Sequence, residues 1–370
     1  MSDTSPTDRI AKAAVLGSID TLSIEGSQIV LSGWALENER PVGNLLLFIN
    51  GKEHQFSRST IARPDLIKGF GEHATGAGFV LKAPLKLTTF EFPHDVRVTP
   101  AHMQDFALPI NPESHLQPLI ALFTKPGAFW THVQNPASRI KHDGTLMYAA
   151  HKALGVHRGD PLIQASSICV IAWRYLLRGG DGLNIRRIVE FGHTTLARLD
   201  KNETVLGTRW YTSLANVLAF CALEMGDLDQ AISHFSHVEK RTERFSGVWI
   251  GTVNGTTARF MGGYIALMRN DNDIAQQKFE ASYRFVNNRL PFFNVDNFWS
   301  FDELLEVARL GQQSFQIYEM LRTNNSSNRL NAGSDFEASA ISTHLIKVLF
   351  QREILPKISI RSIIEADANG

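Results

Sequence analysis

The chain has 370 residues and a mass of 41.3 kDa, and its 37 Lys and Arg residues balance its 37 Asp and Glu residues. A neutral chain has no long-range attraction for nucleic acid or an anionic membrane, and a hydrophobic content of 44% excludes a disordered protein. Domains usually hold about 100–200 residues, so two or three domains are expected. Residues 1–135 hold 11 basic and 13 acidic residues, and the remainder holds 26 and 24, so neither part carries a large net charge.

The cysteines and the N-terminus indicate the cellular compartment. Cys169 and Cys221 both lie in apolar runs, which predicts buried, reduced thiols and excludes a disulfide framework. The polar N-terminus lacks the apolar core of a signal peptide, and no apolar run approaches the roughly 18 residues of a transmembrane helix. We therefore expect a cytoplasmic protein without a membrane span.

Residues 10–110 are expected to form strands, because short apolar runs there are broken by turn residues. The clearest signal is Asn50-Gly51, a hairpin turn that joins the strand 44–49 to a return strand at 53–57. The other expected strands are 21–24, 28–35, 78–82 and 95–98. About six to eight short strands, with no helix-length segment between them, predict an antiparallel β-sandwich.

Five prolines between residues 109 and 136 punctuate the next segment. Because proline interrupts regular elements, we expect a linker or docking segment with short helices there. The predicted organisation is a β-sandwich over residues 1–110, the proline-containing segment over 111–145, a helical repeat domain over 146–360, and a frayed tail over 361–370.

The hydrophobic period becomes helical in the third of these parts. Apolar and small residues at 214–223 precede the turn Gly226-Asp227, and a second helical pattern follows at 228–238. This helix–turn–helix resembles a tetratricopeptide repeat, with Ala in place of the usual first Trp. The matching positions are Ala215, Leu218, Ala219, Ala222, Gly226, Ala231, Phe235 and Val238.

A second copy of this pattern follows at 258–268 and 274–281. Ala275 and Phe279 of this copy stand 44 residues after Ala231 and Phe235. A weaker copy precedes both, from Ile168 through a Gly-Gly-Asp turn to Phe191, and further helices are expected at 301–321 and 336–350. The resemblance implies a tetratricopeptide-like α-solenoid, in which stacked helix pairs bury one continuous core.

An ordered set of residues between positions 29 and 85 stands out from the strands. It consists of Leu31-Ser-Gly-Trp-Ala35, Pro41, Phe48-Ile-Asn-Gly51, Ala62-Arg-Pro-Asp-Leu66 and Gly78-Phe79. This order resembles a small β-sandwich module attached to bacterial glycosyltransferases and other surface-glycan proteins, chiefly of α-proteobacteria. The resemblance implies a bacterial source and a polysaccharide or glycoconjugate context.

Trp34, Arg63 and Asp65 are the candidate ligand-binding residues of this segment. An indole face stacks on a pyranose ring, and Arg and Asp side chains bond its hydroxyl groups. The structural alternative makes Trp34 and Phe79 core residues, uses Gly33 for a bulge or close packing, and makes Arg63 and Asp65 a clamp that orders a long loop. A sugar site predicts that Trp34 is exposed on a concave face.

The helical part offers candidates for a partner groove. Arg174 and Arg178 lie four residues apart on one helical face, near Arg186 and Arg187, and could meet an anionic partner; a solvated face is the alternative. Aromatic side chains could line a groove for an extended peptide, with core packing as the alternative. These aromatic residues are Trp249 and Trp299, together with Phe245, Phe292, Phe293 and Phe298.

Catalytic and metal motifs are weak throughout. Asp227-Leu-Asp229 and Asp271-Asn-Asp273 look like the metal motif of glycosyltransferases, but both fall at an inter-helix turn, where Asp caps the next helix. His234 and His237 could share a metal, yet no third ligand is in view. The phosphate-loop, dinucleotide, zinc-protease and serine-hydrolase motifs are absent. We expect no catalytic residue, metal or cofactor.

These observations favour a non-catalytic interaction or scaffold protein of a bacterial surface-glycan pathway. The β-sandwich would recognise a glycan or dock to a glycan-assembly enzyme, and the repeats would bind a protein partner. Two alternatives stay open. One is a divergent glycosyltransferase, which requires an α/β nucleotide-binding core within 111–370; the other is an assembly component of a surface organelle or phage-like particle.

Overall fold

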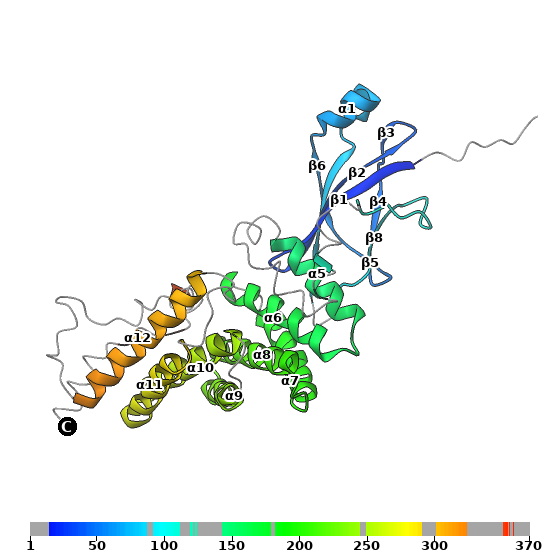
Figure 1. The fold of residues 1–370 in the computed structure, drawn as a ribbon. Helices are drawn as coiled ribbons and strands as arrows, with labels where there is room; N and C mark the ends of the chain where they lie inside the picture. Colours follow the sequence, from blue (N-terminus) through cyan, green and yellow to red (C-terminus); the bar gives the residue numbers. More distant parts are fainter. Residues whose placement is uncertain are drawn as a thin grey trace, which may run out of the picture. The chain divides into compact units, whose positions relative to one another are not determined.

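The computed structural model describes residues 15–86, 92–111, 119–120, 123, 143–178, 182–244, 249–290, 301–323, 351–353, 355 and 358. The chain divides into two compact units (Figure 1). The first comprises Met1–Ala121 and Ile140–Val156, and the second comprises Leu122–Arg139 and His157–Gly370. The described part of the first unit is mainly strands, and that of the second is helical.

The strands of the first unit form two antiparallel sheets. One has the order β1-β2-β7-β6, with β3 paired to β2, and the other has the order β5-β4-β8. The strands are β1 (Val15–Glu25), β2 (Gln28–Glu37), β3 (Arg40–Pro41), β4 (Leu45–Ile49), β5 (Lys52–His54), β6 (Ser57–Ile61), β7 (Gly78–Pro84) and β8 (Val96–Pro100). An N-terminal antiparallel β-sheet region is therefore confirmed.

The Asn50-Gly51 hairpin is present, with φ values of 52° and 78° at its two turn residues. It pairs Ile49 with Lys52, as a two-residue turn with both central residues in the left-handed region does. The return strand is shorter than expected, because β5 ends at His54 and Ser57 already pairs with Lys82 of β7 in the other sheet.

A helix replaces the loop that was expected around the Arg-Pro-Asp-Leu sequence. It is α1 (Pro64–Phe70), followed by the 3₁₀ turn η1 (Glu72–Ala74). Pro64 stands in the first turn of α1, where a backbone N–H has no intrahelical partner and its absence costs little. The fixed φ of proline therefore starts a helix here instead of breaking one.

Gly33 lies at a close approach of β1 and β2. The register of the pair shifts between Ile19 and Thr21, which is a β-bulge at Asp20. A Cβ atom on Gly33 would lie 2.3 Å from the carbonyl oxygen of Ser18 and 3.2 Å from the ring of Phe79. Phe79 is fully buried on the neighbouring strand β7, so the expected close packing at Gly33 and core role of Phe79 are both confirmed.

Helix α5 (Asp143–Val156) belongs to the first unit and packs against β1. Two of its glycines allow this close approach. A Cβ atom on Gly144 would lie 2.8 Å from the Cβ of Ser23, and one on Gly155 would lie 2.8 Å from the Cβ of His94. The hydrophobic period predicts that the helical repeats begin at residue 146. The contacts of α5 with β1 instead place this helix in the first unit, and such contacts arise only in the tertiary structure.

His151 of α5 gives the first unit an expected sensitivity to acid. Its ring is fully buried against Phe92, and neither ring nitrogen has a hydrogen-bond partner among the described residues. Burial lowers the pKa of His151 to about 3, so the folded chain keeps the ring neutral while the unfolded chain takes up a proton below about pH 6.5. The free energy of unfolding should therefore fall as the pH drops from about 6.5 towards 3.

His151→Phe should remove that contribution. We expect the free energy of unfolding of the variant to be about 1 kcal/mol higher at pH 7, since the variant no longer buries two unsatisfied nitrogens. Its advantage over the original chain should grow as the pH falls, which urea titrations of both proteins at pH 7, 6 and 5 will measure. A constant difference across this range would contradict the assignment.

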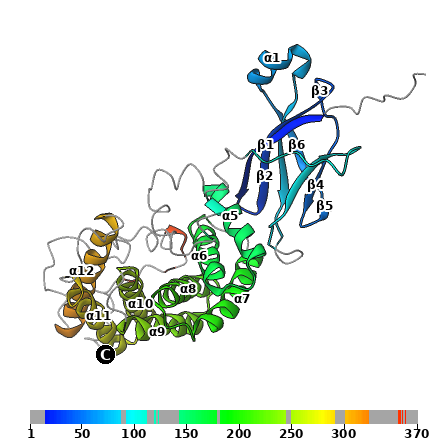
Figure 2. The ribbon, with the colours of Figure 1, turned by 45° about the vertical axis from the view of Figure 1, so that its right-hand side comes forward.

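The second unit consists of successive helices over its described residues, which Figure 2 shows following one another in chain order. They are α6 (Pro161–Arg178), α7 (Gly182–Leu199), α8 (Val205–Glu224), α9 (Leu228–Glu243), α10 (Trp249–Met268), α11 (Asn272–Asn287) and α12 (Phe301–Thr323). None of the helices in the described ranges is long and apolar enough to span a bilayer. The predicted helix 336–350 and most of the predicted segment 111–145 lie outside the described residues.

Two helix hairpins, α8–α9 and α10–α11, repeat the same turn. In the first, the side chain of Asp227 accepts a 2.9 Å hydrogen bond from the backbone N–H of Gln230; in the second, Asp271 accepts a 3.1 Å bond from that of Ile274. The backbone angles at the two caps agree within 6°. Both Asp-x-Asp sequences are thus helix caps, as their position predicts.

The packing inside the two hairpins also repeats. Phe220 of α8 meets Phe235 of α9 edge to face, with ring centroids 5.4 Å apart. Phe260 of α10 meets Phe279 of α11 in the same way, also at 5.4 Å. Edge-to-face contacts of buried rings stabilise the pairing of the two helices.

Removing a cap should cost the same at both turns. Asp227→Ala and Asp271→Ala are each expected to lower the free energy of unfolding by about 1 kcal/mol, the usual value of an N-cap side chain. Asp273→Ala is the matched control, because Asp273 lies within the first turn of α11, beyond the cap, and should change stability by less than about 0.5 kcal/mol. Equal effects of all three in guanidinium titrations would refute the capping role.

Buried polar side chains fix α10 against α8. The amide of Asn254 donates to the hydroxyl of Ser213 at 2.9 Å and to that of Thr212 at 3.3 Å. The amide of Asn216 donates to the carbonyl oxygen of Asn254 at 3.3 Å. Sliding α10 along α8 would break all three hydrogen bonds and leave buried polar groups without partners. The network therefore fixes the register of α10 against α8.

Candidate functional site

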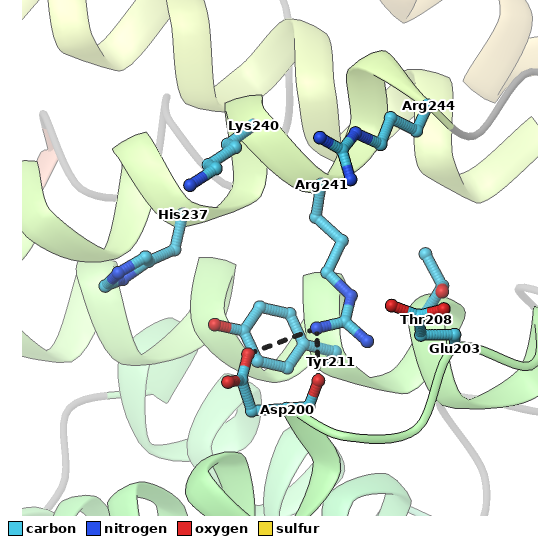
Figure 3. A pocket seen from close by; sticks show the side chains of 8 residues that line it. All are labelled: Asp200, Glu203, Thr208, Tyr211, His237, Lys240, Arg241 and Arg244. Carbon is cyan, nitrogen blue, oxygen red and sulfur yellow. Dashed lines mark hydrogen bonds and ion pairs between the residues drawn. The ribbon is translucent and has the colours of Figure 1, made fainter.

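A polar cavity of about 460 Å³ opens in the second unit, between α8, α9 and the loop that joins α7 to α8. Figure 3 shows its side chains. Its lining residues are Asp200, Glu203, Thr208, Tyr211, His237, Lys240, Arg241 and Arg244. Three of these come from the C-terminal half of α9 and a fourth, Arg244, is its C-cap residue, at the end where a helix dipole favours positive charge.

Arg241 spans the cavity and fixes its walls together (Figure 3). Its guanidinium donates to the backbone carbonyl of Asp200 at 2.9 Å, to the carboxylate of the same residue at 3.2 Å, and to the carbonyl of Asn202 at 2.8 Å. It also stacks over the ring of Tyr211, 4.3 Å from the centroid. Arg241 is therefore a structural strut, and its charge is largely neutralised inside the site.

Lys240 and Arg244 contribute positive charge that is not neutralised in this way. They lie four residues apart, Lys240 in the last turn of α9 and Arg244 at its C-cap; both side chains are exposed, and neither forms an ion pair within the described ranges. Like charges at this spacing repel by a few tenths of a kcal/mol, an unfavourable contact that a bound anion relieves. Glu203, on the opposite wall, is exposed and makes no ion pair with a described residue either.

Tyr211 and Thr208 supply neutral polar groups on the α8 side. Burial raises the pKa of Tyr211, and the neighbouring Asp200 raises it further, against the opposing effect of Arg241. The phenol therefore stays protonated across the physiological range and remains a hydrogen-bond donor. Together the lining residues offer cations, hydroxyl donors and carboxylate acceptors within one cavity.

His234 and His237, three residues apart on α9, lie in different surroundings. Its ring is buried, and its Nε2 lies 3.2 Å from Nε2 of His193 on α7, while His237 is exposed at the cavity. Burial and the two neighbouring histidines lower the pKa of His234 to about 4, so both rings of the close pair are neutral at pH 7. No group of three or more metal-ligating side chains occurs among the residues that the structure describes.

In the first unit, Arg63 forms the expected clamp and extends it to a second carboxylate. Its Nε and Nη2 donate to Asp65 at 2.9 and 2.7 Å, and its Nη1 donates to Asp20 at 2.5 Å. Asp20 is the bulged residue of β1, so the bulge positions this acceptor. The hydrogen bond from Arg63 holds the pKa of Asp65 below its usual value.

Gly78 makes room for this clamp. A Cβ atom at that position would lie 2.6 Å from the Cγ of Arg63 and 2.6 Å from the carbonyl oxygen of Ile61. The Arg-Pro-Asp-Leu and Gly-Phe sequences therefore depend on each other sterically.

Trp34 is half-buried and packs on the outer side of the larger sheet, beneath α1. Its ring centroid lies 6.1 Å from that of Phe70, and both rings border a small buried cluster formed by Leu36, Leu66, Ala74 and Ala77. Trp34 thus packs against a buried cluster on the α1 side of β2, while its buried neighbours Gly33 and Ala35 face the other side, because adjacent strand residues point in opposite directions. Its exposed part remains accessible to a ligand.

The groove candidates are only partly described. Arg174 is half-buried in α6, and the backbone of Arg178 ends the same helix. Arg187 pairs with Glu190 at 2.8 Å on an exposed face of α7, as a solvated cluster does. Trp249 begins α10, but its side chain and the whole of Trp299 lie outside the described residues, as do the phenylalanines grouped with them.

Sequence reasoning missed the cavity on α9. Lys240 and Arg244 carry an i, i+4 cation signal like that of Arg174 and Arg178, but their proximity to Asp200 and Glu203 depends on the packing of α7, α8 and α9. The two buried cysteines behave as expected: both are free, and burial raises the pKa of Cys169 to about 12.

Comparison with known proteins yields no relative, since no family model, no curated protein and no solved structure matches this chain.

Proposed function

We propose that this chain is a non-catalytic interaction protein, in which a β-sandwich module is joined to a tetratricopeptide-like solenoid that binds a protein partner. The setting we propose is a bacterial surface-glycan pathway. The carrying observation is the repetition of the helix hairpin, with equivalent caps and ring contacts in α8–α9 and α10–α11. Stacked hairpins of this kind produce extended surfaces suited to partner binding.

The first unit has a docking role in this proposal. All three guanidinium nitrogens of Arg63 donate to Asp20 or Asp65, so three of its five N–H groups are engaged in holding the clamp together. Trp34, half covered by the residues beneath α1, supports an enzyme-docking surface better than an open stacking platform. Recognition of a glycan through Trp34, Arg63 and Asp65 is the competing form of the same role.

The test uses the full chain as bait in bacterial lysate, followed by purification of the captured protein. We expect that protein to bind the purified chain directly and to slow hydrogen exchange in peptides of α8 to α11. Protection confined to residues 15–86 would overturn the assignment of partner binding to the helices. If no captured protein binds directly and the purified chain forms a homo-oligomer of defined size, that result would favour the assembly role instead.

A glycan array of the full chain tests the first unit separately. Binding that disappears in Trp34→Ala, and persists in variants of the α9 cavity, would assign sugar recognition to the first unit. The docking role predicts no signal that depends on Trp34.

A further inference from the structure

We propose that the cavity between α8 and α9 binds a carboxylate-bearing sugar, a uronic acid residue of an acidic glycan. This goes beyond the proposed function, which assigns the helices to a protein partner and no ligand to the cavity. The volume of about 460 Å³ accommodates one or two sugar rings, and the lining combines cations with hydroxyl and carboxylate groups.

The cationic wall is the site of the sugar carboxylate. Lys240 and Arg244 are exposed, and neither pairs with an acid within the described ranges. One turn of helix separates them, so their charged groups can converge on a single carboxylate. Arg241 is already engaged with Asp200, Asn202 and Tyr211, and it supports this wall without taking part in binding.

The opposite wall is the site of the sugar hydroxyls. Glu203, which makes no ion pair with a described residue, can accept hydrogen bonds from the ligand, and so can the carboxylate oxygen of Asp200 that Arg241 does not contact. Thr208 and Tyr211 offer hydroxyl groups. A uronic acid carries one carboxylate and several hydroxyl donors on a compact ring. It therefore satisfies both walls at once.

Other anions fit this lining less well. A phosphate dianion or a run of acidic peptide residues brings more negative charge against Glu203, which has no ion-pair partner among the described residues, and like charges in one site repel. Stacking of a nucleotide base on Tyr211 would compete with Arg241, whose guanidinium already lies 4.3 Å from the centroid of that ring. The carboxylate of Glu203 thus favours a singly charged, hydroxyl-rich ligand.

Isothermal titration of the full chain with digalacturonate is the direct test, with cellobiose as the uncharged comparison. We expect binding of digalacturonate that weakens as salt is added, and no binding of cellobiose. The double variant Lys240→Gln/Arg244→Gln should lose affinity by about tenfold or more, because charge-assisted hydrogen bonds are removed. The matched control Arg40→Gln/Lys52→Gln removes two exposed cations of the first unit and should bind as the original chain does.

Glu203→Gln separates a sugar from a simple anion by the sign of its effect. For a uronic acid, the loss of a charged hydroxyl acceptor should weaken binding about threefold. For inorganic phosphate or a tetraglutamate peptide, removing a negative charge should strengthen binding. Absence of digalacturonate binding, equal binding of cellobiose, an unaffected double variant, or stronger binding in Glu203→Gln would each overturn the proposal.

A negative result for sugar binding is distinguishable from a negative result for the proposed function. The sugar titration reports on Lys240, Arg244 and Glu203 alone, and the exchange footprint of the protein partner covers α8 to α11. Circular dichroism of each variant checks the fold, which exposed side chains at these positions should leave unchanged.

Discussion

Gly33→Ala is expected to lower the free energy of unfolding of the first unit by about 3 kcal/mol. The new methyl group would lie 2.3 Å from the carbonyl oxygen of Ser18, which is backbone and cannot rotate away, and 3.1 Å from the Cα of Ile19. β1 and β2 must separate at the bulge to admit it. Because that bulge holds Asp20, the variant should also loosen the clamp of Arg63.

Gly43→Ala is the matched control, since a Cβ atom there meets no atom within 4 Å. Hydrogen-exchange mass spectrometry of peptides from β1 and β2 will follow both variants, and only Gly33→Ala should accelerate exchange. Equal behaviour of the two variants would show that close packing at Gly33 does not limit the stability of this sheet.

Phe285→Ala is expected to lower the free energy of unfolding of the second unit by about 3–5 kcal/mol. The guanidinium groups of Arg259 and Arg289 lie 3.8 and 3.7 Å from the centroid of its ring. The ring also fits against Gly255, where a Cβ atom would lie 2.5 Å from Cζ. The truncated variant leaves a cavity and removes a π-face from Arg259, which is 96% buried at its side chain.

Phe315→Ala is the comparison for that prediction, because Phe315 is 38% exposed on α12 and packs on Tyr283 from the surface. It should cost about 1 kcal/mol. Phe285→Leu should fall between the two alanine variants, since it fills most of the volume and lacks the π-face. Guanidinium titrations of the three variants measure this order, and a Phe285→Leu chain as stable as the original would exclude a contribution from the stacked arginines.

Local sequence signals predicted the elements where local chemistry dominates. Asn50-Gly51 gave its hairpin because both residues tolerate positive φ, and Asp227 and Asp271 capped their helices because a short carboxylate reaches the free N–H groups. The same reasoning misjudged Pro64, which was treated as part of a loop and instead begins α1. A proline signals the end or the start of a helix, and the sequence leaves the choice open.

The candidate residues show the same division. The clamp between Arg63 and Asp65 follows from their separation of two residues, whereas its second partner, Asp20, lies 43 residues away and meets it only through the β1 bulge. The sequence left Trp34 open between a ligand-binding and a core role, and the pleat of β2 together with α1 places it against a buried cluster beneath that helix.

The sequence by itself determined the change from strands to helices, the repeated hairpin and its caps, and the burial of the two cysteines, because each depends on period, spacing or composition over a few residues. Only the tertiary structure decided the association of α5 with β1, the His193–His234 pair, and the cavity that sets Lys240 and Arg244 opposite Glu203. Those features join residues about 40 or more positions apart, and their contacts arise from how helices and strands pack, which no local pattern encodes.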